Sequence, residues 1–160
     1  MAVVRDQHKM RLHLYACYAI LCASMQLPET SLRIWAAQNV SPEWLAMVMG
    51  LAGVPWCLKP VVGAFSDAHP VCGRHRSPYI LLHCVLYMLA WLGIGHNLDS
   101  HATFAVLFVL QSYCIVVVDV MMDAVLVTQV RKESTEEAGT LQSNVWICRA
   151  AGALLSSIAG

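Results

Sequence analysis

Residues 102–130 read ATFAVLFVLQSYCIVVVDVMMDAVLVTQV, a run of 29 positions in which only Asp119 and Asp123 carry charge. A membrane-spanning helix needs roughly 20 predominantly apolar residues, so this run is long enough to cross a bilayer with some tilt. The stretch therefore predicts a transmembrane helix.

The rest of the chain repeats this pattern of apolar runs between short polar links. Hydrophobic residues make up 58% of the 160 positions and charged residues 12%, against roughly 25% charged in an ordinary globular domain. So few polar groups cannot cover the surface of a soluble domain of this size. We predict an all-α, polytopic transmembrane helix bundle, with helices at about 12–35, 42–65, 78–97, 102–130 and 139–160.

Two of these helices contain proline in informative places. Ser41, Pro42 and Glu43 form a favourable helix start, which places the beginning of the second helix. Pro28 follows an apolar run of only 14 residues, 14–27, so the first helix spans the bilayer only if Pro28 kinks it without ending it. The alternative is a secretory signal peptide before a secreted α-helical domain, since basic residues precede the same run.

The positive charges are unevenly placed between the predicted helices. If the helices alternate in direction, one side of the membrane holds only Arg33. Basic residues favour the cytoplasmic side, so the N-terminus is predicted to be cytoplasmic, in a plasma membrane or an organelle membrane. The formal net charge is zero, which gives no reason to expect a nucleic-acid partner. The basic residues on the predicted cytoplasmic side are Arg5, Lys9, Arg11, Arg74, Arg76, Arg131 and Lys132.

Four ionisable residues lie inside apolar helices: Lys59, Asp119, Asp123 and Arg149. Each costs about 2.5–3.5 kcal/mol to insert at the centre of a membrane helix. Such residues usually mark a water-filled path or a paired site, so these four are the candidate functional residues.

Asp119 and Asp123 are four residues apart and therefore share one face of their helix with Gln111. Two carboxylates this close repel each other, which favours keeping a proton on one of them. One interpretation is a proton carrier for coupled transport. The other is a structural charge network with Arg149 that only fixes helix packing.

Arg149 and Trp146 lie on one face of the last helix, and each has two interpretations. Arg149 can pair with a carboxylate of helix 102–130, or its planar fork can bind an anionic substrate. Trp146 can stack on a planar ring or serve only in packing. Lys59, in helix 42–65, can contact substrate or extend its long stem to the membrane interface.

Motifs of soluble enzymes are missing from the sequence. It contains no phosphate-binding loop, no GxSxG and no HExxH, and its seven cysteines form no CxxC pair. We therefore expect no enzyme activity, no metal site and no cofactor.

The segment from Pro55 to Tyr79 resembles a known family. Gly63-Ala-Phe-Ser-Asp67 followed by Gly73-Arg74-His75-Arg76 resembles the signature loop of the major facilitator superfamily. The longer pattern around it is similar to the folate–biopterin transporter family, which the second block also matches. The matching residues are Pro55, Trp56, Lys59, Pro60, Gly63, Asp67, Pro70, Gly73, Arg76, Pro78 and Tyr79, then Asp119, Asp123, Arg131, Gly139, Gln142, Trp146, Arg149 and Gly152.

This resemblance implies about twelve helices in two halves, of which the chain supplies part of the N-terminal half. It implies a secondary active transporter in the lipid bilayer, with folate- or pterin-like substrates, alternating access and proton coupling. It also implies that Asp67, Arg74 and Arg76 form a charge latch at the cytoplasmic gate. Because the chain ends within an apolar helix, we expect a missing C-terminal half to be needed for function. The alternatives are a non-transporting truncated membrane protein, or a carrier of an unrelated small solute.

Overall fold

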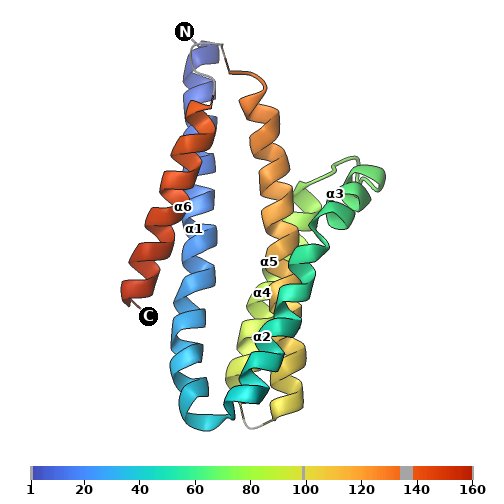
Figure 1. Cartoon of the computed structure of the whole chain (residues 1–160). Coiled ribbons are helices and arrows are strands. Elements are labelled where there is room, and N and C mark those ends of the chain that lie inside the picture. Colours follow the sequence, from blue (N-terminus) through green and yellow to red (C-terminus); the bar gives the residue numbers. More distant parts are fainter. Residues whose placement is uncertain (1, 99, 134–138, 160) are drawn as a thin grey trace. The chain divides into compact units, whose positions relative to one another are not determined.

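The computed structural model describes residues 2–98, 100–133 and 139–159, with the backbone alone for residues 2–9 and Ala37. It contains no β-strand in this described part of the chain, so the all-α prediction is confirmed. The helices, shown in Figure 1, are α1 (Ala2–Asn39), α2 (Pro42–Cys57), α3 (Lys59–Ala68), α4 (Ser77–His96), α5 (His101–Val130) and α6 (Thr140–Ala159). The predicted helix end at Gly160, and residues 134–138 of the last polar link, lie outside the described residues.

The helix predicted at 42–65 is two helices, α2 and α3, bent by 43° at their junction. The cause is local: Pro55 and Pro60 have no N–H to donate, so two rungs of the helical ladder are missing. At the junction the N–H of Leu58 instead bonds the carbonyl of Pro55 three residues back, at 3.0 Å. The helical ladder is therefore weakest between Pro55 and Pro60.

The first helix is longer than the predicted 12–35, because α1 begins at Ala2 and ends at Asn39 with Pro28 inside it. Pro28 thus does not end the helix. Near its C-terminal end, Arg33 pairs with Glu29 one turn earlier at 2.6 Å.

Side chains cap two of the later helices. The N–H of Trp44 donates to Ser41 Oγ at 3.3 Å, which confirms the helix start predicted from Ser41 and Pro42. Glu133 accepts bonds from the N–H of Gly139 at 3.0 Å and of Leu141 at 2.9 Å. Its carboxylate thus satisfies donors at the start of α6 that no helical carbonyl can reach.

The chain forms two compact units, of which the first contains residues 1–39 and 125–160. In this unit α1 and α6 lie side by side and run in the same direction (Figure 1). The two backbones touch at Gly152, where an added Cβ would overlap the carbonyl oxygen of Ala19. Gly152 and Ser156 are buried, as expected for small residues that let two membrane helices approach closely.

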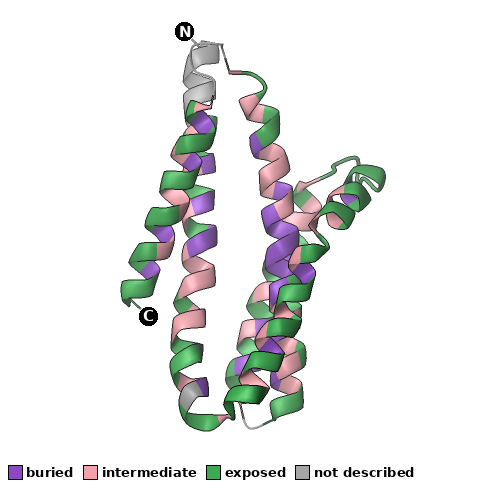
Figure 2. Cartoon of the chain, in the orientation of Figure 1, coloured by how far each residue is buried: buried purple, intermediate pink, exposed green. Residues whose placement is uncertain are grey.

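The second unit contains residues 40–124 and is built from α2, α3, α4 and most of α5. Figure 2 shows a long buried stretch along α5, where the residues from Cys114 to Asp119 are all buried. Consecutive helical residues point in all directions, so α5 is enclosed over this stretch.

Two described helices, α4 and α5, are long and apolar enough to cross a membrane, and the bent pair α2–α3 is a third if it forms one span. These helices make the chain an integral membrane protein. Of the five spans expected from the sequence, two or three therefore have the length and composition needed to cross a membrane among the described helices. Polar and charged residues such as Asn144 and Arg149 lower the apolar character of α6.

Candidate functional site

An ion pair inside the second unit joins two of the four candidate residues. Lys59, the first residue of α3, donates from Nζ to Oδ2 of Asp119 on α5 at 2.6 Å. The Asp119 side chain is fully buried, whereas that of Lys59 is 31% exposed. Lys59 Nζ also lies 4.5 Å from the centre of the Trp56 ring, in cation–π geometry.

This arrangement gives the membrane-embedded lysine two neighbours that lower the cost of its charge. A buried charge is tolerated when it is paired and hydrogen-bonded, and removing one partner leaves the other costly. Because part of the Lys59 side chain is exposed, the ion pair lies at the edge of the buried region of the unit. The ion pair is therefore both a structural contact and a candidate binding point.

Asp123 lies one turn beyond Asp119 on α5 and is half-buried. The residues from Asp119 to Asp123 thus place two carboxylates on one face, as the sequence pattern predicts. Asp119 is the more enclosed of the two, and its described partner comes from α3.

A second cluster lies in the first unit, between α1 and α6. The Arg149 guanidinium carbon is 5.8 Å from the centre of the Tyr18 ring and 5.1 Å from that of Trp146. Tyr18 is fully buried, whereas Trp146 is 57% exposed. One turn away, Asn144 donates to the hydroxyl of Tyr15 at 3.4 Å. The cluster therefore offers a planar cation beside an accessible aromatic ring.

The predicted gate residues lie at the end of α3, where Asp67 stands, and in the α3–α4 loop, which carries Arg74 and Arg76. Arg76 lies 3.6 Å from Asp67, so the structure brings these two together. Arg74 stabilises the loop through its backbone, which exchanges two hydrogen bonds of 3.0 Å with Val71. The turn between them places Cys72 and Gly73 at positive φ, which glycine adopts at little cost and cysteine rarely adopts.

Tyr79 of α4 fixes the start of this loop. Its hydroxyl donates to the carbonyl of His69 at 2.7 Å. The His69 ring in turn stacks on Phe65, with centroids 4.5 Å apart, and Phe65 meets the Tyr79 ring edge-on. The loop is therefore held at a defined place between α3 and α4.

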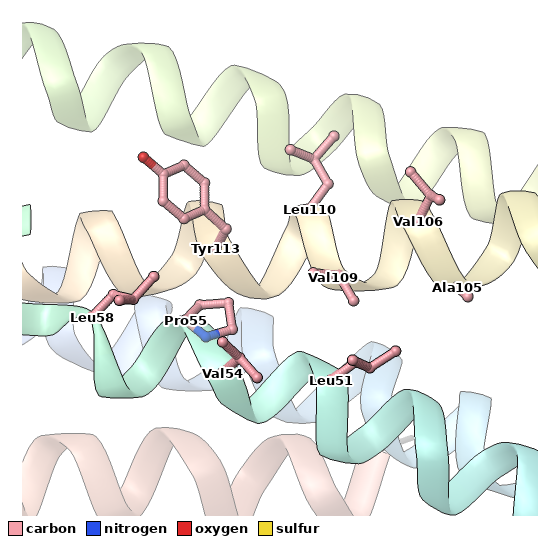
Figure 3. Close-up of a pocket in the computed structure, with 9 residues that line it drawn as sticks. All are labelled: Leu51, Val54, Pro55, Leu58, Ala105, Val106, Val109, Leu110 and Tyr113. Carbon is pink, nitrogen blue, oxygen red and sulfur yellow. The ribbon is translucent and has the colours of Figure 1, made fainter.

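An apolar pocket of about 630 Å³ lies between α2 and α5 within the second unit. Figure 3 shows its lining side chains, with Pro55 and Leu58 at the α2–α3 junction and Tyr113 on α5. No charged residue lines it, so it offers room but no anchor for an anionic group. The other lining residues are Leu51, Val54, Ala105, Val106, Val109 and Leu110.

The sequence did not identify Tyr18, Trp56 and Ser112 as parts of these sites. Trp56 stands three residues before Lys59, a spacing that places both on one helix face and could have suggested the ring contact. Ser112 stands two turns before Asp119 and donates to the carbonyl of Ala52 at 2.6 Å. In the described residues, no group of three or more His, Cys, Asp or Glu side chains is placed to hold a metal ion.

The helices and the buried ion pair define a polytopic helical membrane protein with charged residues held inside its bundle. Residues 23–160 match the sequence profile of the BT1 family, and the chain belongs to this family. The resemblance to folate–biopterin transporters seen in the sequence is thereby confirmed.

Similar proteins carry folate–biopterin transporter names. The chain is 33% identical over 125 residues to probable folate-biopterin transporter 4 of Arabidopsis thaliana. The aligned region covers 76% of this chain and 26% of that protein. The chain is 30% identical over 121 residues to the folate-biopterin transporter of Synechocystis sp., covering 76% and 24% of the two chains. The chain thus spans about a quarter of the length of these curated relatives. No solved structure matches it.

Proposed function

We infer that this chain forms part of a secondary active transporter for folate- or pterin-like solutes, with Lys59 and Asp119 at its substrate and coupling site. The observation that carries the proposal is the 2.6 Å ion pair between a fully buried carboxylate and a partly exposed lysine. Charges held inside membrane helices usually mark a transport path. Family membership supports the same class of protein.

Substrate binding uses charge exchange at Lys59. An anionic group of the solute, such as a carboxylate, takes the place of Asp119 beside the ammonium group. Arg149 and the exposed ring of Trp146 form a separate candidate binding point within the first unit, since a guanidinium binds carboxylates and an indole stacks on a flat ring. A folate-like molecule has both an acidic part and a flat ring.

Proton coupling follows from the same exchange. When Lys59 moves to the substrate anion, the buried carboxylate of Asp119 loses this cation, so its negative charge becomes more costly and uptake of a proton from water becomes more favourable. Asp123, one turn away on the same face, disfavours a second negative charge and supports protonation. Release of the substrate restores the ion pair and returns the proton.

The gate and the membrane orientation complete the proposal. Asp67, Arg74 and Arg76 form the latch of a cytoplasmic gate, with the N-terminus of the chain on the same side of the membrane. Alternating access then moves this bundle against a second one around a midplane site. That second bundle is the C-terminal half expected from the family pattern.

Uptake of labelled folate and biopterin tests this function in cells that lack their own uptake and express the intact gene. We expect uptake that Asp119→Asn and Lys59→Gln each abolish, when uptake is normalised to the amount of protein at the cell surface. Thr103→Ala, on the same helix as Asp119, is the matched control and should transport normally. Normal proton-dependent uptake by the Asp119→Asn protein would refute the coupling role, and no uptake of either solute would refute the substrate class.

A further inference from the structure

Three contacts hold α2 and α3 against α5 in constant register. The Trp44 ring packs on Phe104 at 5.4 Å, Ser112 donates to the Ala52 carbonyl, and Lys59 pairs with Asp119. Each contact joins residues that are 60 positions apart, so the two segments run parallel without slipping. The three residues on α5 are about two turns apart and therefore share one face.

The α2–α3 junction lies between the second and third of these contacts. Ala52 precedes Pro55, and Lys59 follows Leu58, so one polar contact holds each side of the 43° bend. Around the bend the backbone lacks the donors of Pro55 and Pro60, which lowers the usual resistance of a helix to bending. Contacts with α5 thus have a large share in setting the bend angle.

The surroundings of the junction leave room for it to move. Pro55 and Leu58 line the apolar pocket of Figure 3, so open space adjoins the bend on that side. The α3 segment itself makes few buried contacts, since Ser66 is its only residue classed as buried among these described positions.

We propose that the α2–α3 junction is a hinge, with Ser112 as the anchor of α2 and the Lys59–Asp119 pair as the releasable hold on α3. Opening of that pair removes the polar hold of α5 on the first residue of α3, while α2 stays fixed to α5 through Ser112. This inference rests on the proposed function for the charge exchange at Lys59. It adds that rotation of α3 links this exchange to the gate residues Asp67 and Arg76.

The geometry links the hinge to the loop directly. Asp67 lies eight residues after Lys59, near the far end of α3, and pairs with Arg76 at 3.6 Å. A helix of ten residues is about 15 Å long, so each 10° of hinge rotation moves its far end by about 2.6 Å. Such a displacement is enough to break the Asp67–Arg76 contact. Release of Lys59 therefore opens the latch without a separate signal.

Distances between paired spin labels test the hinge in the full-length protein. Labels at Ala64→Cys and Val106→Cys report on α3 relative to α5, and labels at Leu51→Cys and Val106→Cys report on α2 relative to α5. In an otherwise cysteine-free background, Asp119→Asn should shift or broaden the first distance by at least about 2.6 Å, the value for a 10° rotation, and leave the second unchanged. Lys59→Gln should give the same result if Asp119→Asn does not fold.

The anchor and the hinge each have a separate variant. Ser112→Ala should broaden the distance between α2 and α5, and Ser112→Thr, which keeps the hydroxyl, should restore it. Pro60→Ala returns an N–H to the junction and should reduce the displacement caused by Asp119→Asn.

Equal distances in wild type and in both ion-pair variants would overturn the hinge, as would α2 and α3 moving together. Loss of uptake without movement of α3 would leave the transport role standing and remove the hinge. Movement of α3 with normal uptake would retain the hinge and refute the proposed coupling site.

Discussion

Asp119 is the residue on which the charge balance of the second unit depends. Its side chain is fully buried, and its ion pair with Lys59 joins α5 to the first residue of α3. Replacing both members of a buried pair with apolar groups is often neutral or stabilising, whereas removing one member leaves a buried charge.

The Lys59→Met variant should therefore lose stability by roughly 3–5 kcal/mol, and Lys59→Met/Asp119→Leu should recover most of it. Thermal unfolding of the detergent-solubilised protein measures both. If the double variant is no more stable than Lys59→Met alone, the unpaired Asp119 charge does not cause the loss of stability. Transport should fail in both variants, which separates folding from function.

Gly152 makes the closest approach between α1 and α6. A methyl group there would overlap the Ala19 carbonyl, and backbone atoms cannot move aside as a side chain can. Gly152→Ala should thus cost about 1–3 kcal/mol, as overpacking typically does. Gly50→Ala is the matched control, because nothing lies within 4 Å of its added Cβ. A drop in melting temperature for Gly50→Ala as large as that for Gly152→Ala would contradict this explanation.

At the scale of elements, the break between α2 and α3 was the feature that the sequence predicted least well. The apolar pattern from Pro42 to Phe65 indicates one helix, since hydropathy does not register the loss of two N–H donors. Pro55 and Pro60 were visible in the sequence, but Pro28 has the same chemistry and leaves α1 unbroken. The difference lies in spacing: two prolines five residues apart remove neighbouring rungs, whereas one removes a single rung.

The candidate site shows the same division between local and long-range information. Four charged residues in apolar helices were recognisable from composition alone, and so was the shared face of Asp119 and Asp123. The choice of partner was not recognisable, because Lys59 and Asp119 are 60 residues apart and meet only through packing of α3 on α5. The Asp67–Arg76 contact was accessible through family resemblance, because both residues belong to one short motif that runs from the end of α3 to the start of α4.

The hydroxyl of Tyr79 is one of the groups that hold the α3–α4 loop in place. Tyr79→Phe keeps the ring against Phe65 but removes the hydrogen bond to the His69 carbonyl. A hydrogen bond of this kind contributes about 0.5–1.5 kcal/mol net, so its loss should let the loop open roughly two to ten times more often. Trypsin cleavage after Arg74 and Arg76 should accelerate by that factor, whereas cleavage after Arg33 should not change. An unchanged rate at all three sites would show that the bond does not order the loop.

For the whole molecule, the distribution of basic residues predicts that the α3–α4 loop faces the cytoplasm. Cys72 is exposed in this loop and reports on its side of the membrane. In a variant that keeps only this cysteine, a membrane-impermeant maleimide should label Cys72 only after permeabilisation. A variant with Ser100→Cys as its only cysteine should be labelled in intact cells, because the α4–α5 link lies on the opposite side. The reverse pattern would invert the proposed orientation.

The continuity of α1 has a consequence for its two ends. A helix of 38 residues is about 57 Å long, while the hydrocarbon layer is about 30 Å thick. Even with considerable tilt, several turns of α1 must therefore project into water or among lipid headgroups. The salt bridge of Glu29 with Arg33 suits a helix end that lies in water or among headgroups, because both of its members are charged.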